Sequence, residues 1–255
     1  MHIQAYLQFK EQSERLVSFA VLISYAVPEL ANELSLPTPS PTAVRRSDFY
    51  HKSNTCNPTE LLKTASTYEQ QLASYVLLSS FSFFEAFVVG AVEELIDFHG
   101  GAEEFQRRST KRLRDRLAIE HKPLQKDIAK LRTTEKGRNR DRYRTVSRAL
   151  ASNNFRFPSE LLNSYGIKSL IEDISRLKAF QIPDFLRTAF AVPLTDREVE
   201  RFHEIRLERN AVAHGNAGPL TMRTVTSYGL FLRELAIKTA DHISKHFFVI
   251  EKYAP

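Results

Sequence analysis

The stretch LLSSFSFFEAFVVGAVEELI, residues 77–96, lies in a long segment with helical spacing that runs from Pro58 to Phe98. At 3.6 residues per turn, one face of this segment carries Glu85 together with apolar side chains only, namely Leu78, Phe81, Val88, Val89, Val92 and Ile96. The chain contains only 8 glycines among 255 residues, and no segment shows the alternation typical of strands. The sequence therefore predicts an all-α fold in which a carboxylate lies in the centre of an apolar helix face.

The expected organisation is a helix in residues 1–34, a connector with four prolines in residues 35–59, and a helical domain in residues 60–255. Residues 107–148 form a basic insert in this domain. The spacing of apolar residues, together with the positions of glycine and proline, predicts helices in residues 2–27, 58–98, 102–120, 123–132, 143–151, 166–180, 195–215 and 220–246.

Composition also limits the class of protein. The longest uncharged apolar run, Leu16–Val27, is too short to cross a bilayer, and no basic segment or cleavage site marks a signal peptide. The single cysteine allows no internal disulfide. No glycine-rich loop for a nucleotide phosphate is present, and we expect no cofactor and no metal. These features predict a cytoplasmic protein that does not bind a membrane.

Another helix is predicted in residues 195–215, TDREVERFHEIRLERNAVAHG, and its apolar face carries Arg209. Thr195 and Glu198 have the spacing of a capping box. Because a charge on such a face needs a partner, we expect Glu85 to pair with Arg209 or Arg206. Such a pair could also serve only to set the register of the two helices.

The sequence RNAVAH, residues 209–214, resembles the Arg-x4-6-His motif of the HEPN superfamily, in which a polar residue often follows the arginine. This resemblance implies an all-α, HEPN-like helical bundle, found in ribonucleases of toxin–antitoxin and phage-defence systems. It also implies a homodimer in which two such helices meet and contribute to one cleft.

These residue types suit RNA cleavage, because RNA supplies its own nucleophile, the 2′-hydroxyl. We interpret Arg209, Asn210 and His214 as catalytic residues: Arg209 holds phosphoryl oxygens, His214 exchanges protons, and Asn210 orients the imidazole or contacts the phosphate. Glu85 and Arg206 are predicted to support them. The function expected is a metal-independent endoribonuclease, acting as a toxin or antiviral effector and restrained by an antitoxin or another defence protein.

Two alternatives remain open at this point. In one, the chain is a non-catalytic nucleic-acid-binding or scaffold module, and Arg209 and His214 stabilise an interface. In the other, it is a helical partner of another defence protein, and its basic segment binds an acidic protein surface.

The basic insert carries 16 lysine or arginine residues and 5 acidic residues, whereas the whole chain has a net charge of +6. Such a segment favours binding to the phosphate backbone of RNA, although a solvated helix face has a similar composition. The predicted nucleic-acid-binding residues are Arg107, Arg108, Lys111, Arg112, Arg114, Arg138, Arg140, Arg142 and Arg144.

Overall fold

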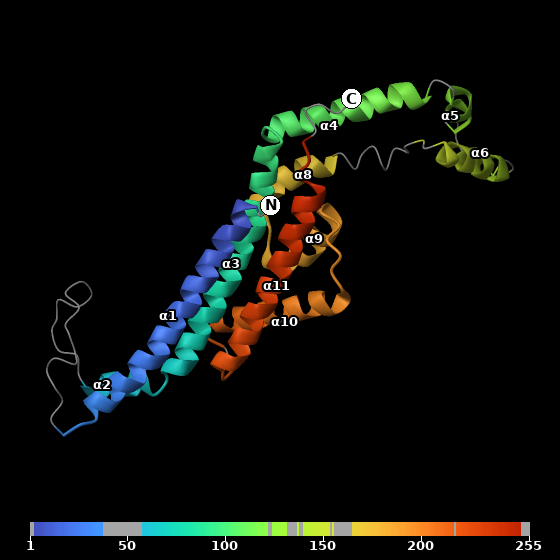
Figure 1. Cartoon of the computed structure of the whole chain (residues 1–255). Helices are drawn as coiled ribbons and strands as arrows, with labels where there is room; N and C mark the ends of the chain where they lie inside the picture. The colour runs from blue at the N-terminus through green and yellow to red at the C-terminus, as the bar shows by residue number, and fades with distance from the viewer. Residues whose placement is uncertain are drawn as a thin grey trace. The chain divides into compact units, whose positions relative to one another are not determined.

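The computed structural model describes residues 3–37, 58–121, 124–131, 137, 140–153, 155, 165–216 and 218–250, and every regular element in these ranges is a helix (Figure 1). The predicted all-α fold is therefore confirmed. The elements are α1 (Gln4–Leu34), α2 (Pro58–Ala65), α3 (Tyr68–Phe98), α4 (Ala102–His121), α5 (Gln125–Leu131), α6 (Arg140–Ser152), α8 (Tyr165–Asp173), the 3₁₀ helices η2 (Ile174–Arg176) and η3 (Ala179–Gln181), α9 (Ile182–Ala189), α10 (Asp196–Ala213) and α11 (Met222–His246).

Two of the predicted helices, 58–98 and 166–180, are interrupted, and two others, 2–27 and 143–151, extend further than predicted. The segment 58–98 is interrupted at Ser66 and Thr67, whose hydroxyl groups donate to the carbonyl groups of the preceding turn at 2.7 and 3.1 Å. Such side-chain bonds compete with the helix backbone. α1 passes Pro28 and continues to Leu34, although an interior proline removes a backbone donor and its ring crowds the preceding turn. The segment 166–180 ends as an α-helix at Asp173 and continues as 3₁₀ turns.

The chain forms two compact units, residues Met1–Glu94 with Lys178–Val249, and residues Leu95–Leu177 with Ile250–Pro255. The first unit contains α1, α2, most of α3, and α9 to α11. The sequence predicted the N-terminal helix as an element separate from the helical domain. In the structure, α1 belongs to the same unit as α10 and α11. Residues 38–57 of the predicted connector lie outside the described residues.

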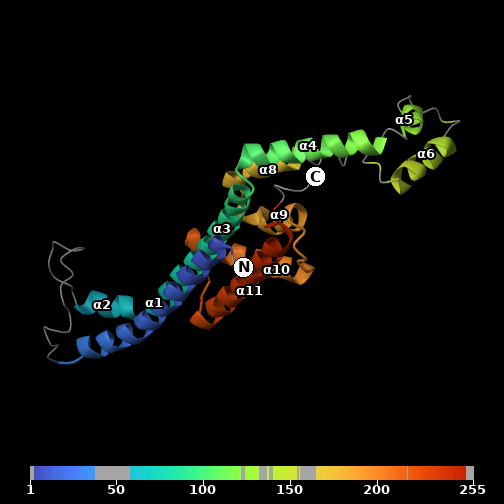
Figure 2. The same ribbon diagram turned by 45° about the horizontal axis from the view of Figure 1, so that its top comes forward.

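α3 is the central helix of the first unit and packs against both α10 and α1. The rings of Phe81 and Phe84 lie 5.4 and 5.8 Å from that of Phe202 in α10. The ring of Phe9 in α1 lies 5.8 Å from that of Phe87 and 6.2 Å from that of Phe84. Figures 1 and 2 both show α1 running alongside α3. A Cβ atom at Gly90 would lie 3.3 Å from that of Ala5, so the two helices approach closely there.

The N-terminus of α1 is held by Glu94 of α3. Its carboxylate accepts hydrogen bonds from the backbone N–H groups of Gln4 and Ala5, both at 2.9 Å. A carboxylate at this position compensates the free N–H groups and the positive end of the helix dipole. The contact fixes the position of α1 along α3.

α10 and α11 are joined by polar contacts. Lys238 donates to Glu198 at 2.8 Å, and the guanidinium of Arg201 lies 4.8 Å from the ring of Tyr228. Nε2 of His242 lies 2.8 Å from the carbonyl oxygen of Phe190, so this histidine serves to connect α11 to the end of α9.

The second unit contains the basic segment. α3 ends as predicted at Gly100 and Gly101, which adopt φ values of 91° and 93° that only glycine adopts readily. Next to them, the buried ring of His99 stacks on Phe105 of α4 at 4.7 Å. In α6, Val146 and Leu150 are buried.

Two helices, α1 and α3, are long and apolar enough to cross a membrane when judged by length and composition alone. α3 is the packed central helix of its unit, and 44% of its most apolar window is buried. The corresponding window of α1 is only 6% buried. The apolar window of α1 is therefore much more exposed than that of α3.

Candidate active site

Both ends of α10 are defined by local hydrogen bonds. At the N-terminus, the hydroxyl of Thr195 accepts from the N–H of Glu198 at 3.2 Å, and the Thr195 N–H donates to that carboxylate at 2.6 Å. This is the predicted capping box. At the C-terminus, Gly215 has φ 72°, and the N–H of Asn216 reaches back to the carbonyl of Ala211 at 2.8 Å. This pattern is a Schellman motif, and it makes His214 the C-cap residue, directly after the end of α10 at Ala213.

The guanidinium of Arg209 lies between α10 and α3. Its Nη2 donates to Oε2 of Glu85 at 2.9 Å, and its Nη1 donates to Oδ1 of Asn210 at 3.1 Å. Its Cζ lies 5.2 Å from the centroid of the Phe81 ring, close enough for a cation–π interaction. The predicted ion pair between the two helices is therefore confirmed, and Arg209 rather than Arg206 forms it.

The ion pair is half-buried. The side chains of Arg209 and Glu85 are 25% and 29% exposed. Burial raises the pKa of Glu85 above its ordinary value, while the charge and hydrogen bond of Arg209 lower it. The cost of removing the Glu85 carboxylate from water thus outweighs its attraction to Arg209. The ion pair offsets only part of that cost.

Phe81 is the contributor that sequence reasoning did not single out. It is completely buried, and its ring forms the surface over which the guanidinium lies. The available signal was its position, one turn before Glu85 on the same helix face. Since Glu85, Asn210 and Phe81 each contact Arg209, the orientation of the guanidinium is defined from three sides.

His214 differs from Arg209 in that it is exposed. Its backbone N–H donates to the carbonyl of Asn210 at 3.0 Å, and within the described residues its imidazole makes no hydrogen bond. The amide of Asn210 is turned toward Arg209, so it does not orient the imidazole here. Because Oδ1 is the atom used, the Asn210 amide N–H groups remain available as donors to a ligand.

Arg206 and His203 lie on α10 one and two turns before Asn210. Both are only partly exposed. Three nitrogen atoms of α10 are buried and have no hydrogen-bond partner among the described residues: Nδ1 of His203, Nε of Arg206 and Nε of Arg209. Within the described chain Arg206 forms no ion pair. A partly buried guanidinium without a carboxylate is costly, which is typical of a site that an anion or another chain completes.

The basic residues of the second unit differ in whether they pair with an acidic side chain. Arg107 and Arg108 both bond the carboxylate of Glu104, Arg107 through two atoms at 2.7 Å. These bonds, first that of Arg107 and then that of Arg108, lower the pKa of Glu104 to about 2. Arg144 lies 3.8 Å from Asp141.

Other members of the predicted basic surface are exposed and form no ion pair within the described chain: Lys111, Arg140 and Arg142. Arg112 is partly exposed and has an interaction of its own. Arg138 and the side chain of Arg114 lie outside the described residues. The structure therefore leaves three cations of this surface open to a ligand.

The groups on α10 suit a reaction at a phosphate. A planar guanidinium can donate two parallel hydrogen bonds to phosphate oxygens, and an exposed imidazole can accept or donate a proton near neutral pH. The described residues contain no cluster of three histidine, cysteine or acidic side chains that could hold a metal ion. The side chains at hand therefore supply a cation and a proton carrier.

A family model described as RiboL-PSP-HEPN matches residues 47–245. The match includes α2, α3, α10 and most of α11, and it begins after α1. No curated protein and no solved structure gives a significant match to the chain.

Proposed function

The chain belongs to the RiboL-PSP-HEPN family, as the Arg-x4-His motif predicted, and from this we propose that it is a metal-independent endoribonuclease. The active residues of this proposal are Arg209, Asn210 and His214, with Glu85 and Arg206 in support. The observation that carries it is the guanidinium of Arg209, which three neighbours orient, together with the exposed imidazole of His214 five residues further along the chain.

The reaction that these groups support is an internal transesterification. The 2′-oxygen of a ribose attacks the adjacent phosphorus, the bond from phosphorus to the 5′-oxygen breaks, and a 2′,3′-cyclic phosphate forms. The 2′-hydroxyl loses a proton to a base and the departing 5′-oxygen gains one from an acid. His214 is exposed at the C-terminus of α10, and we assign it the transfer of a proton to the departing 5′-oxygen.

Arg209 and Asn210 stabilise the charge that develops on the phosphoryl oxygens. The bond to Glu85 leaves part of the guanidinium fork available, and removal of one such preorganised donor typically costs about 100- to 1,000-fold in rate. The partly buried guanidinium of Arg206, which has no ion pair in the described chain, also supports an anionic ligand on this face of α10.

A second copy of the chain can complete this site. One α10 helix supplies a single histidine at its end, whereas the reaction uses both an acid and a base. Two α10 helices facing each other would bring two imidazoles and two guanidinium groups to one RNA strand. Within this proposal the enzyme acts as a toxin or antiviral effector, and an antitoxin or another defence protein would restrain it by covering the same face.

A non-catalytic RNA-binding module is the second candidate, and the ion pair between Arg209 and Glu85 favours it. An arginine that is already paired can serve to join α10 to α3, while Lys111, Arg140 and Arg142 bind the RNA backbone. In this case the exposed His214 would have no part in a reaction.

Purified wild-type protein and the His214→Ala variant, incubated with total RNA in EDTA, distinguish the two candidates. The endoribonuclease proposal expects cleavage by the wild type and a loss of about 100-fold or more in the variant, because general acid–base catalysis contributes roughly 100- to 10,000-fold. His242→Ala is the matched control, since that histidine contacts only structural groups. Equal cleavage by wild type and His214→Ala, or none by either with RNA binding intact, would contradict the proposal.

A further inference from the structure

The four arginines of α10 differ in how their charge is compensated. Arg201 and Arg209 each bond a glutamate, and Arg197 is exposed to water. Arg206 is partly buried, and it forms no ion pair within the described residues. A guanidinium in this position is costly, because it loses part of its hydration and gains no opposite charge. The folded chain thus keeps at Arg206 a charge that its own side chains do not neutralise.

The neighbours of Arg206 on the helix add to this cost. Residues three and four positions apart lie side by side on an α-helix, so Arg206 lies beside Arg209 and Asn210. On its N-terminal side it lies beside His203 in the same way. None of these three residues is negatively charged, and Arg209 is already bonded to Glu85. Because two neighbouring cations on one helix repel each other, a bound anion would relieve both the repulsion and the missing ion pair.

Arg206 and His203 both have their outer nitrogen atoms at the surface. Nε of Arg206 and Nδ1 of His203 are buried, whereas Nη1 and Nη2 of Arg206 and Nε2 of His203 are not. With its hydrogen on Nε2, a neutral imidazole keeps its donor at the surface and leaves the buried Nδ1 without a hydrogen to satisfy. The two side chains thus present N–H donors beside each other, and phosphate oxygens accept hydrogen bonds from such donors.

We propose that Arg206 and His203 form a second phosphate subsite on α10, which binds the phosphate next to the one that is cleaved. The inference rests on the proposed function, because Arg209 and Asn210 define the place of the scissile phosphate. Four residues of helix rise by about 6 Å, which is comparable with the separation of neighbouring phosphates along an RNA strand. The strand therefore runs along α10, with the scissile phosphate nearer the C-terminus of the helix and its neighbour one turn nearer the N-terminus.

The subsite acts on the reaction by positioning the strand. A phosphate held one nucleotide away from the scissile bond fixes the register of the RNA and helps to align the 2′-oxygen with the phosphorus atom. Arg206 and His203 are thus positioning residues and take no part in proton transfer. The second phosphate requires a positive charge rather than the planar fork of an arginine, because no charge develops on it during the reaction.

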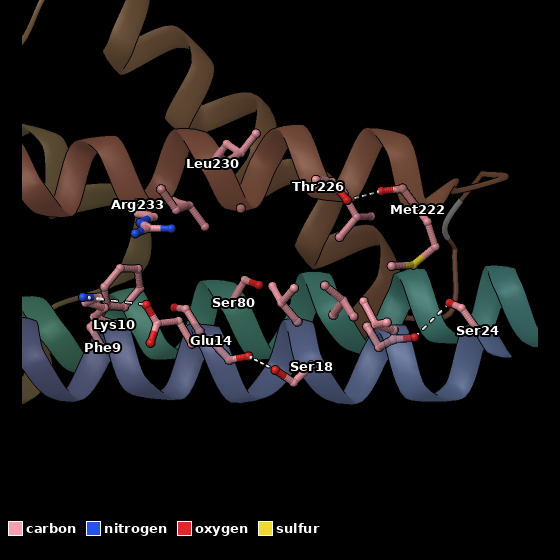
Figure 3. A pocket seen from close by; sticks show the side chains of 18 of the residues that line it. Phe9, Lys10, Glu14, Ser18, Ser24, Ser80, Met222, Thr226, Leu230 and Arg233 are labelled. Carbon is pink, nitrogen blue, oxygen red and sulfur yellow. Dashed lines mark hydrogen bonds and ion pairs between the residues drawn. The ribbon is translucent and has the colours of Figure 1, made fainter. Parts of the chain in front are cut away.

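The groove between α1 and α11 is a less suitable path for the strand. It has a volume of about 750 Å³, and apolar side chains such as Val17 and Leu230 form most of its lining (Figure 3). Its charged side chains lie at one end, where Arg233 faces Lys10 and Glu14. Lys10 lies 3.8 Å from Glu14, so its charge is already met. A phosphate chain gains affinity from several cations along its path, and α10 provides them where this groove does not.

The first test measures RNA affinity without cleavage. A short RNA in which every 2′-hydroxyl is methylated cannot undergo transesterification, and fluorescence anisotropy gives its affinity. Arg206→Gln should weaken binding about tenfold at about 100 mM salt, because a hydrogen bond to a charged group and one phosphate contact are lost. Arg206→Lys should retain most of the affinity, because it keeps the charge. His203→Ala should weaken binding by a smaller factor, about threefold, because one neutral donor is lost.

Arg197→Gln is the matched control for the loss of charge. Arg197 is exposed and lies nine residues before Arg206, about two and a half helical turns away and therefore on the opposite face of α10. Its replacement should change RNA affinity less than about twofold. Equal affinities of Arg206→Gln and Arg197→Gln would overturn the subsite.

Stability distinguishes a ligand site from a structural role. Since Arg206→Gln removes a cation that has no partner in the part of the chain that the structure describes, the midpoint of urea denaturation should stay the same or rise. A lower midpoint together with unchanged RNA affinity would show that Arg206 only stabilises the fold, and would overturn the proposal.

The second test fixes the register of the strand by chemistry. In a short DNA that contains one ribonucleotide, at a sequence that the wild type cleaves in total RNA, transesterification occurs only at the phosphate after that ribose. A neutral methylphosphonate at one of the two neighbouring phosphates should lower kcat/KM of the wild type about tenfold and have little further effect in Arg206→Gln. The same loss in both proteins would show that Arg206 does not contact that phosphate, and would overturn the proposal.

These outcomes separate the subsite from the endoribonuclease proposal. Cleavage by the wild type, with equal affinities of Arg206→Gln and Arg197→Gln, would remove the subsite and leave the reaction intact. No cleavage by the wild type, with RNA affinity still reduced in Arg206→Gln, would remove the reaction and retain an anion-binding subsite. Reduced self-association of Arg206→Gln in sedimentation equilibrium, with unchanged RNA affinity, would assign Arg206 to a contact between chains and overturn the proposal.

Discussion

The two units contain arginine–glutamate pairs of the same chemistry in different surroundings. Arg209 and Glu85 join helices that are far apart in the sequence, and burial raises the pKa of the glutamate. Arg107 and Glu104 are three residues apart on one helix, and hydrogen bonds from Arg107 and Arg108 lower the pKa of that glutamate to about 2. Burial, and not the presence of an arginine, therefore decides the direction in which the pKa of the glutamate shifts.

The proposed function assigns the two units different roles. In the first unit it depends on the position of one guanidinium, which Glu85 and Phe81 hold in place. In the second unit it depends on the summed charge, because exposed arginines and lysines are interchangeable toward a phosphate backbone.

The largest effect is expected from replacing the two arginines in turn. Arg209→Lys should lower RNA cleavage about 100-fold, because an ammonium cannot bond Glu85, Asn210 and a phosphate in one plane. Arg107→Lys should change cleavage less than about twofold. Initial cleavage rates at equal protein concentration measure both. Similar losses in the two variants would remove the distinction between the units.

The next largest effect concerns RNA binding by the second unit. Reversing Lys111, Arg140 and Arg142 to glutamate should weaken binding of a single-stranded RNA roughly tenfold or more at about 100 mM salt. The slope of log affinity against log salt should also become shallower, by about 0.7 for each lost phosphate contact. The matched triple replacement, Lys to Arg and Arg to Lys, should preserve both quantities. Fluorescence anisotropy at several salt concentrations provides the measurement, and an unchanged slope would show that this surface does not meet phosphates.

Stability separates the two glutamates. Glu85→Ala leaves the partly buried Arg209 without its partner and should lower the free energy of unfolding by about 1–2 kcal/mol, less than for a fully buried pair because both side chains retain some exposure. Glu104→Ala removes a pair within one helix at the surface and should have no measurable effect. Urea denaturation of both variants tests this. Equal losses would mean that burial is not what distinguishes the pairs.

The smallest effect is a pH dependence. Since the pKa of Glu85 is raised above 4.5 in the folded chain, the folded state binds more protons than the unfolded state just above that pH. The contribution of Glu85 to stability should therefore decline as the pH rises through this window. We expect the free energy of unfolding of the wild type, relative to Glu85→Gln, to fall by less than about 1 kcal/mol between about pH 4.5 and 7. A relative stability that rises with pH would contradict the direction of the shift.

Much of the fold could be predicted because local signals agree with the tertiary structure. The capping box at Thr195 and the glycine after His214 define α10, and the charge on each apolar face predicted the pair of Glu85 and Arg209. Spacing could not choose between Arg206 and Arg209, because both lie near the apolar face and the outcome depends on where α3 crosses α10. The break at Ser66 depends on two side-chain hydrogen bonds, and the groove beside α1 depends on which helices neighbour it. Neither feature can be predicted from the spacing of apolar residues within one segment.

The end of α10 beside His214 limits where residues can be inserted in this part of the chain. A rigid helix sets the offset between guanidinium and imidazole, so one residue added between Arg209 and His214 would swing the imidazole by about 100°. The same insertion after Gly215, where the chain has already left the helix, would move neither group. The proposed active site therefore predicts that natural variation in length occurs after Gly215 and not between Arg209 and His214.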